Sequence, residues 1–422
     1  MNYKKQEIKQ GIELHTINTN KFKTNLVAIF LSLPIKRENV TYNAMISSVL
    51  RRGTKKMPTQ EQISKELENM YGATFDCGID KTGDNHIFKF YLESINDKFL
   101  PQKDENMLKS SIENLLEIVF NPLVENEKFN SEYVEQEKVN VRRRIEAKID
   151  NKAKYAIERC IEEMYKNEPY GLYKFGYVED LENINASNLY EHYRTLMNTC
   201  KIDIFVSGNI ESDISELVIN NENIQKLKER EPNYIKTQYI EKEQVEEKKI
   251  SESMEVTQGK LIMGLDINLK EQKEKYITSV YNAVLGGSAT SKLFQEVREK
   301  ASLAYTASSN FIRHKGNIII SCGIEIKNYE KALEIIRKQL EDIKKGNFTE
   351  EELQNAKKGI ISTIKGIAEE QDTEITYYFG QTISEEKVGT EEYIKIIEGI
   401  SKEEVIEIAS RINVNTIYFL KD

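Results

Sequence analysis

Histidine and cysteine, the residue types best suited to metal binding and nucleophilic catalysis, are scarce and scattered in this sequence. No two histidines have the spacing that places both on one face of a helix, and the cysteines form no CxxC pair. The residues are His15, His86, His192 and His314, and Cys77, Cys160, Cys200 and Cys322. We expect exposed or core-satisfied histidines, and reduced thiols in a cytoplasmic protein. An enzyme with an unrecognised active site would need a nucleophile and base that only the fold brings together.

Length and composition limit the elements that could position a site. The chain of 422 residues has 60 Lys and Arg against 69 Asp and Glu, a net charge of −9, which argues against a nucleic-acid partner. At about 150 residues per domain, this length predicts two or three domains. No apolar stretch follows the charged start, and no apolar run approaches the ~20 residues that span a bilayer, so we expect neither a secretory signal nor a membrane partner.

Strand and helix patterns occur twice in the same order. The first half predicts a strand at 26–33, a hairpin at 73–80 and 85–92, and a strand at 201–206, with long helical patterns at 105–119 and 126–166. The second half predicts a strand at 260–267, a helix at 274–285, a hairpin at 303–311 and 316–324, helices at 329–344 and 349–369, and a strand at 415–420. These patterns predict an α+β protein with two similar halves, each a mainly antiparallel β-sheet with packed helices. We expect halves at 1–210 and 251–422, joined by a charged linker at 211–250.

Two sequence motifs carry a family resemblance. Residues 285–305 read LGGSATSKLFQEVREKASLAY, and residues 44–54 read AMISSVLRRGT, followed by a helix and ENMYGA at 68–73. This pattern resembles the pitrilysin/insulinase family of zinc peptidases, which includes the mitochondrial processing peptidase. The segments at 11–17 and 21–24 look like its YfmF-type bacterial branch. The resemblance implies a LuxS/mitochondrial processing peptidase-like metallohydrolase fold, with two halves closing as a clamshell around a cavity.

Active members of that family carry HxxEH on a helix, with two histidines as zinc ligands and the glutamate as general base. Counting back from the Gly-Thr pair at 53–54, the three positions are Ala44, Ser47 and Ser48. Neither histidine nor the glutamate is present. The sequence therefore departs from the family at each position of the motif.

The family's third zinc ligand is a glutamate on a later helix. The matching stretch of this chain places Arg143 and Arg144 opposite the family's Glu-Glu pair. A guanidinium repels a cation and cannot complete a zinc site. We therefore expect no bound metal and no other cofactor. The arginine run at 142–144 predicts a solvated helix rather than a nucleic-acid surface.

The resemblance also implies functional residues in the second half. In family members with split chains, an arginine and a tyrosine of this half support the partner's zinc site, and the matching residues are Arg298 and Tyr305. The alternatives are a solvated helix residue for Arg298 and a packed strand residue for Tyr305. Gly286 and Gly287 match a glycine-rich loop that guides substrate in noncatalytic subunits, or they are a helix C-cap.

These observations favour a noncatalytic subunit, or pseudo-peptidase. By resemblance it pairs with a zinc-bearing homologous peptidase as a heterodimer, or forms a homodimer, and binds a peptide or unfolded polypeptide. One alternative is a purely structural assembly protein of the same fold. The other is a peptidase with an unrecognised active site.

Overall fold

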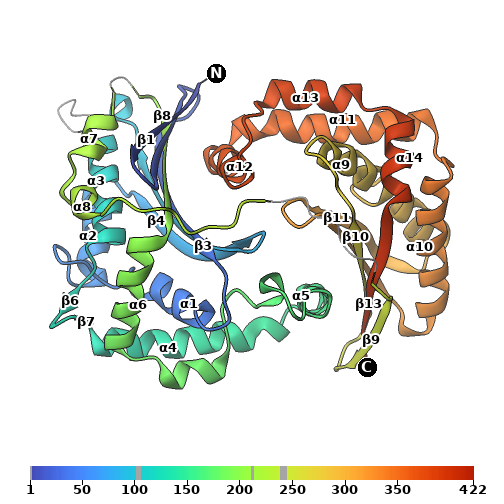
Figure 1. Cartoon of the computed structure of the whole chain (residues 1–422), viewed down its shortest axis with the longest axis horizontal. Coiled ribbons are helices and arrows are strands. Elements are labelled where there is room, and N and C mark those ends of the chain that lie inside the picture. The colour runs from blue at the N-terminus through green and yellow to red at the C-terminus, as the bar shows by residue number, and fades with distance from the viewer. Residues whose placement is uncertain (1, 101–105, 211–212, 238–244) are drawn as a thin grey trace. The chain divides into compact units, whose positions relative to one another are not determined.

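The computed structural model describes residues 2–100, 106–210, 213–237 and 245–422, which divide into two compact units (Figure 1). Unit 1 comprises Met1–Ala147, Leu172–Lys236 and Ala368–Ile383. Unit 2 comprises Lys148–Gly171, Thr237–Ile367 and Ser384–Asp422. Each unit is therefore assembled from three separate stretches of the chain. None of the described helices is long and apolar enough to span a membrane.

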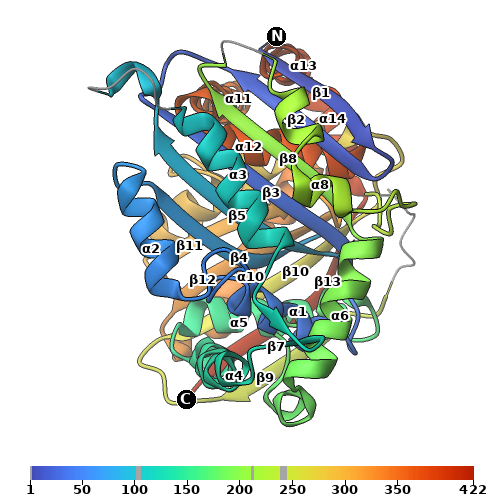
Figure 2. The same cartoon turned by 90° about the vertical axis from the view of Figure 1, so that its left-hand side faces the viewer.

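Unit 1 is built on a six-stranded sheet with the order β1-β2-β8-β3-β5-β4 (Figure 2). The strands are β1 (Tyr3–Lys9), β2 (Ile12–Asn18), β8 (Lys201–Gly208), β3 (Thr24–Pro34), β5 (Asn85–Ile95) and β4 (Thr74–Thr82). Neighbouring strands are antiparallel except β2 and β8, which are parallel. β4 is the free edge on one side, and with β5 it forms the hairpin that the sequence predicted.

The two faces of the unit 1 sheet are covered differently. One face carries α1 (Val40–Val49) and α3 (Met107–Phe120), whose apolar residues join the main core. The outer helices are α2 (Gln60–Asn69), α4 (Ser131–Glu146), α6 (Ala186–Thr199), α7 (Ser215–Ile219) and α8 (Glu222–Lys226). The opposite face carries a smaller aromatic cluster, in which Phe30 stacks on Phe379 of α12 (Gln371–Ser384) with ring centroids 4.2 Å apart.

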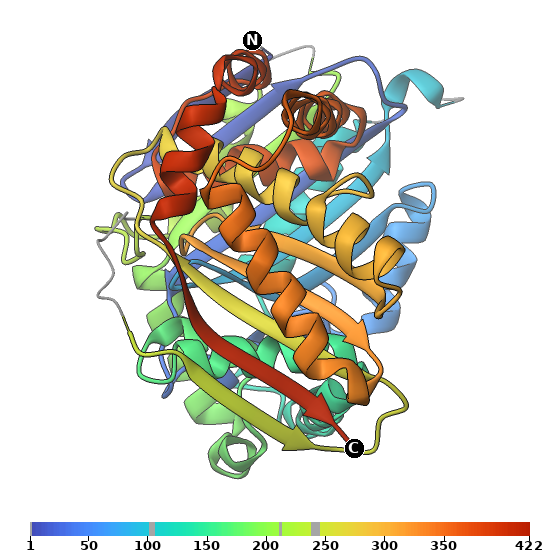
Figure 3. The ribbon, with the colours of Figure 1, turned by 90° about the vertical axis from the view of Figure 1, so that its right-hand side faces the viewer.

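Unit 2 repeats the pairing scheme of unit 1. Its five-stranded sheet has the order β11-β12-β10-β13-β9 (Figure 3). The strands are β11 (Ala304–Ile312), β12 (Asn317–Ile324), β10 (Gly259–Ile267), β13 (Ile412–Lys421) and β9 (Lys248–Ser253). The β13–β9 pair is parallel and the others are antiparallel, as in the corresponding strands of unit 1. The prediction of two similar α+β halves is confirmed.

Helices cover both faces of the unit 2 sheet. One face carries α9 (Glu274–Leu285), α10 (Tyr329–Lys344), α11 (Glu350–Gly366), α13 (Thr390–Gly399) and α14 (Lys402–Ser410). The other face carries α5 (Lys152–Met164), whose buried residues pack on Ile262, Ile319 and Tyr418. α5 comes from the first half of the sequence, just as α12 of unit 1 comes from the second. Each sheet is therefore completed by a helix from the opposite half of the chain.

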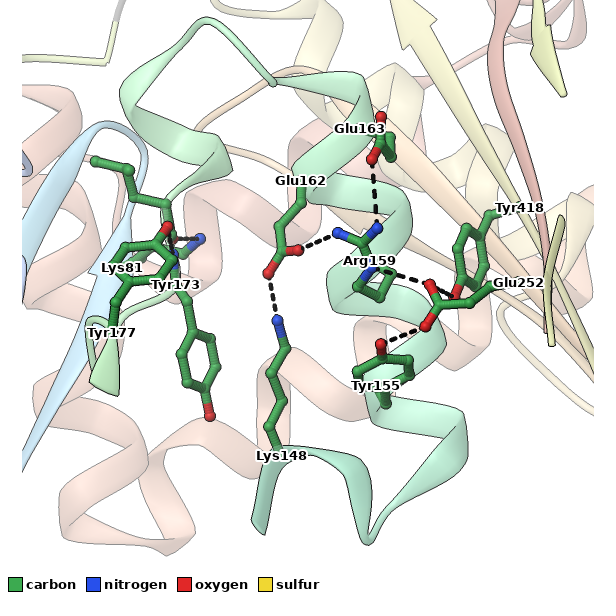
Figure 4. Close-up of polar contacts among 11 residues, drawn as sticks. Lys81, Lys148, Tyr155, Arg159, Glu162, Glu163, Tyr173, Tyr177, Glu252 and Tyr418 are labelled. Atoms are coloured by element: carbon green, nitrogen blue, oxygen red, sulfur yellow. Dashed lines mark hydrogen bonds and ion pairs between the residues drawn. The ribbon is translucent and has the colours of Figure 1, made fainter. Parts of the chain in front are cut away.

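An ion-pair network attaches α5 to the edge of its sheet (Figure 4). Arg159 of α5 contacts Glu162 at 2.6 Å and Glu252 of β9 at 3.1 Å. Glu252 also accepts hydrogen bonds from the hydroxyls of Tyr155 at 2.5 Å and Tyr418 at 2.8 Å. Lys148 pairs with Glu162 as well. The side chain of Glu252 therefore ties α5, β9 and β13 together.

Two sequence predictions need correction. The helical pattern at 126–166 is not one long helix, because it contains β7 (Lys128–Phe129), α4 and α5, and follows β6 (Val124–Glu125). Its apolar spacing continues across the break between α4 and α5, which pack in different units. The segment at 211–250 includes α7, α8 and the start of β9, and its residues 211–212 and 238–244 lie outside the described part, as does Glu105 of the helix at 105–119.

Candidate functional site

The three α1 positions that correspond to the family's zinc motif lie inside the core of unit 1. Ala44, Ser47 and Ser48 are all buried. Both hydroxyls donate to the main-chain oxygen of Ala44, Ser47 at 2.9 Å and Ser48 at 3.2 Å. Such back-bonding within a helix uses the only donor of each serine. The hydroxyls are thus committed to their own helix.

The last turn of α4 lies close to these positions. Arg143 and Arg144 are exposed there, and the Arg144 guanidinium lies 5.2 Å from the centre of the Phe175 ring. Burial raises the pKa of Cys77 to about 11, against the opposing charges of Arg51 and Arg144. The Cys77 thiol donates to the main-chain oxygen of Ser47 at 3.4 Å. α4 itself packs against α1.

These side chains do not fit a zinc ion. Structural and catalytic zinc sites use imidazole, thiolate or carboxylate ligands. Here α1 offers a methyl group and two hydroxyls that are already hydrogen-bonded, and the nearby α4 side chain is a cation. The chemistry of this donor set excludes the hydrolytic centre of the active relatives at this place.

Two histidines instead surround α1 as neutral core residues. Asn43 donates from Nδ2 to Nδ1 of His86 at 3.0 Å and accepts at Oδ1 from Nε2 of His192 at 2.8 Å. His86 in turn contacts the main-chain oxygen of Lys174 at 2.9 Å. Burial lowers the pKa of His86 to about 3 and that of His192 to about 4. The interpretation as core-satisfied histidines is confirmed for both.

A second polar group was not predicted from the sequence. Glu13, His15 and Asp203 bring ligand atoms within 4.8 Å of one another on β2 and β8. Lys201 pairs with Glu13 at 2.7 Å and with Asp203, while Tyr3 hydrogen-bonds to His15 at 2.8 Å. Burial works to raise the pKa of Asp203, but Lys201 and His15 outweigh it and hold that pKa well below its usual range. The ammonium groups of Lys201 and of Lys5, which pairs with Glu13 at 2.7 Å, balance the two carboxylates.

The sequence signal for this group is weak because it depends on long-range register. Glu13 and His15 alternate on one strand, Lys201 and Asp203 on another, and the parallel pairing sets Glu13 opposite Asp203. Only alternation of charged residues within otherwise apolar strands marks the group in the sequence.

Arg298 lies in an unusual helical turn of unit 2. Residues Phe294–Lys300 form a π-helix, a geometry that is rare and frequent at functional sites. The Arg298 side chain is 42% exposed; its guanidinium lies 4.5 Å from the centre of the Phe294 ring, and Nε is 3.6 Å from Glu299. The buried Val297 anchors the turn. The Arg298 side chain therefore contacts other residues of its own helix, Phe294 and Glu299.

Two further backbone irregularities occur at and just before Tyr305. Ser302 has φ +52°, a left-handed conformation that non-glycine residues rarely adopt. The register of edge strand β11 shifts between Ala304 and Thr306, so Tyr305 lies in a bulge, and it is 67% exposed. Bulges re-aim side chains and concentrate near active sites. The alternative of a tyrosine packed beside the buried Leu303 is wrong.

Gly286 and Gly287 follow α9 and are fixed by close packing. Gly286 is the C-cap residue, and its carbonyl accepts from the amide of Ser309 on β11 at 3.0 Å. A Cβ at Gly286 would lie 2.5 Å from that nitrogen, and one at Gly287 would lie 2.9 Å from Cα of Ala283. The glycines thus allow a tight approach of the α9 end to β11.

Comparison with known proteins gives consistent relatives. A family model described as "Peptidase M16 inactive domain" matches residues 183–360. The "Probable inactive metalloprotease YmfF" of Bacillus subtilis (strain 168) is 34% identical over 420 residues, covering 97% of this chain and 96% of that protein. The "Uncharacterized zinc protease YmxG" of the same organism is 26% identical over 209 residues, covering 48% of this chain and 50% of that protein.

Solved structures agree on the fold. A conserved protein from Enterococcus faecalis V583 is 26% identical with a TM-score of 0.88, covering 100% of this chain and 99% of that one. A peptidase M16 inactive domain from Pseudomonas fluorescens is 16% identical with a TM-score of 0.80, covering 100% and 98%. The fold and the missing ligand set define a metallopeptidase-like protein without the zinc centre. The chain belongs to the M16 peptidase family.

Proposed function

We propose that this chain is a noncatalytic, cytoplasmic subunit that pairs with a zinc-bearing M16 homologue and supports its peptidase activity. The proposed partner would be a zinc protease. One relative of this chain, YmxG, carries that description in its name. In this role the chain contributes peptide binding, with Arg298 as a rigid cationic donor and Tyr305 as a phenol donor toward the peptide backbone and the oxyanion formed at the partner's zinc.

One contrast carries the proposal. The positions for zinc chemistry on α1 are buried and hydrogen-bonded within their own helix. Arg298 and Tyr305, by contrast, remain exposed on a π-helix and a bulged edge strand. Irregular backbone of this kind costs free energy and persists where surrounding structure or function requires it. A purely structural partner would have no need to keep these two donors exposed.

Edge strands offer a way to bind peptide backbone. β4 is the free edge of the unit 1 sheet, and a groove of about 650 Å³ lies beside it. Side chains of β4 and β5, among them Asp76 and Lys89, line the groove together with Gln371 and Thr376 of α12. An extended peptide can pair with such an edge through main-chain hydrogen bonds, which suits a substrate recognised by its backbone more than by its sequence.

The test combines the chain with its HxxEH homologue. We expect a heterodimer whose peptide turnover exceeds that of the homologue alone. Arg298→Ala and Tyr305→Phe should leave the heterodimer intact and lower turnover, by up to ~10²–10³-fold if each donor acts on the oxyanion. Arg298→Lys should rescue only partly, because an ammonium lacks the planar fork.

Matched controls separate catalysis from general surface effects. Arg194→Ala removes an arginine with an exposed side chain on α6, and Tyr71→Phe removes the hydroxyl of another exposed tyrosine. Both controls should behave like the unmodified chain. Normal assembly with unchanged turnover in the Arg298 and Tyr305 variants would favour a structural assembly protein instead. Hydrolysis by the chain alone would indicate an unrecognised active site.

A further inference from the structure

A polar cavity of unit 2 has no role in the function proposed above. It measures about 330 Å³ and is lined by residues of α9, α11 and α13 and of the end of β11. Its polar lining comes from Ser279, Asn282, Ser288, Asn310, Arg313 and Thr363. This volume is at the lower end of the range for small-molecule sites.

Arg313 supplies the only charge among the residues that line this cavity. Its guanidinium carbon lies 4.9 Å from the centre of the Tyr276 ring and 5.1 Å from that of Tyr393, and Nη2 donates to the Tyr393 hydroxyl at 3.2 Å. Within the described ranges Arg313 makes no ion pair, and its Nε has no hydrogen-bond partner. A guanidinium that is positioned by two aromatic rings and has no anionic partner can bind an anion.

The surrounding charges leave a single positive charge at this place. Lys275 is ion-paired with Glu386. Burial lowers the pKa of His314 to about 4, with the charges of Arg313 and Lys275 acting in the same direction, so this imidazole is neutral at pH 7. A ligand with one negative charge is matched by this guanidinium, whereas the second charge of a dianion such as phosphate would lose its hydration without gaining a partner.

Asn282 adds a second requirement. Its Nδ2 donates to the main-chain oxygen of Ser309 at 3.4 Å, while its Oδ1 has no partner among the described residues. The ligand therefore carries a donor as well as an anion. No carboxylate lines the cavity to accompany an ammonium, so we expect a neutral donor, an N–H or an O–H. A carboxylate beside an amide N–H is the chemistry of a peptide C-terminus.

Gly359 keeps the α11 side of the cavity open. A Cβ built at this position meets no atom within 4 Å, although glycine in the interior of a helix is unfavourable. Gly287 lines the opposite side, at the end of α9. The absence of these two side chains leaves room for the backbone of one or two residues.

We propose that this cavity binds the C-terminal end of a short peptide, with its carboxylate on Arg313 and its last amide N–H toward Asn282. The site belongs to this chain alone and does not require a zinc-bearing partner. It would hold a released peptide end rather than the bond being cleaved.

Calorimetric titration of the full chain with N-acetyl-Ala-Ala tests the proposal. We expect binding at submillimolar to millimolar concentration, and at least tenfold weaker binding of the C-terminal amide of the same peptide. Arg313→Met should weaken binding by about tenfold to a hundredfold, the usual effect of losing a charged hydrogen-bond partner. Tighter binding of inorganic phosphate or free alanine would overturn the assignment to a peptide end.

A pair of glycine variants tests the site independently, in case the Arg313 variant loses binding only because it misfolds. Gly359→Leu fills the cavity from a helix position with no steric collision at Cβ and should abolish binding. Gly366→Leu is made on the same helix, also with no atom within 4 Å of Cβ, but outside the cavity lining, and should bind normally. Binding that survives Gly359→Leu, or that is absent from the unmodified chain, contradicts the proposal.

Discussion

The side-chain amide of Asn43 donates to Nδ1 of His86 at 3.0 Å, directly beside the α1 position where active relatives carry their first zinc ligand. This part of unit 1 thus contains imidazole, but as a fully buried acceptor of a hydrogen bond. His86 packs as part of the core and does not face a substrate.

Stability should therefore fall in mild acid. The pKa of His86 is lowered to about 3 by burial, from an ordinary value of 6.5, so the unfolded chain binds more protons between these values. The contribution of neutral His86 to the free energy of unfolding is complete above pH 6.5 and is lost as the pH falls. One such histidine lowers the free energy of unfolding by about 2 kcal/mol between pH 6.5 and pH 5. Urea unfolding at pH 7 and pH 5 should show a smaller difference for His86→Gln than for the unmodified chain. An equal difference in both would contradict the burial argument.

Installing the family's motif on α1 should not create a peptidase. Ala44→His, Ser47→Glu and Ser48→His place large side chains at buried positions, and overpacking costs about 1–3 kcal/mol per site. The third ligand is also absent, with Arg144 nearby. We expect no stoichiometric zinc by elemental analysis and no peptide hydrolysis. Adding Arg144→Glu is the matched comparison, and activity of the triple variant alone would show that α4 was wrongly aligned.

Removing the charge of Glu252 should loosen unit 2. Burial works to raise the pKa of Glu252, but hydrogen bonds from Tyr155, Tyr418 and Arg159 outweigh it and lower that pKa. Glu252→Gln weakens three contacts at once and should cost about 1–3 kcal/mol of unfolding free energy. Glu163→Gln, which contacts Arg159 only at 3.4 Å, is the control and should cost much less. Equal thermal stability of the two variants would rule out a central role for Glu252.

Glycine-to-alanine substitutions at two places should have opposite signs. Gly286→Ala forces a Cβ to 2.5 Å from the Ser309 amide nitrogen and should destabilise by about 1–3 kcal/mol. Gly359→Ala meets no atom within 4 Å and should stabilise α11 by about 0.5–1 kcal/mol. Chemical denaturation measures both. Tolerance of alanine at Gly286 would indicate a loop that moves freely away from β11.

Local structure could be read from the sequence where the signal acts within a few residues. The helices at 274–285 and 329–344 occur as predicted. Thr59 followed three residues later by Gln62 is also a capping-box pattern, and this capping box forms at the start of α2. Side chains one helical turn apart interact directly, so spacing and caps determine such elements. The departure from the zinc motif is also a property of the sequence, because it depends only on which residue types are present.

Contacts between segments that are far apart in the sequence were determined by the tertiary structure. α5 and α12 each cover a sheet built mainly from the other half of the chain. This arrangement depends on side-chain packing, which helical periodicity does not encode. The bulge that exposes Tyr305 and the parallel register that joins Glu13 to Asp203 come from strand pairing. The cavity at Arg313 requires three helices and a strand end. Side chains brought together in this way are neighbours only in the folded chain, so no pattern along the sequence specifies them.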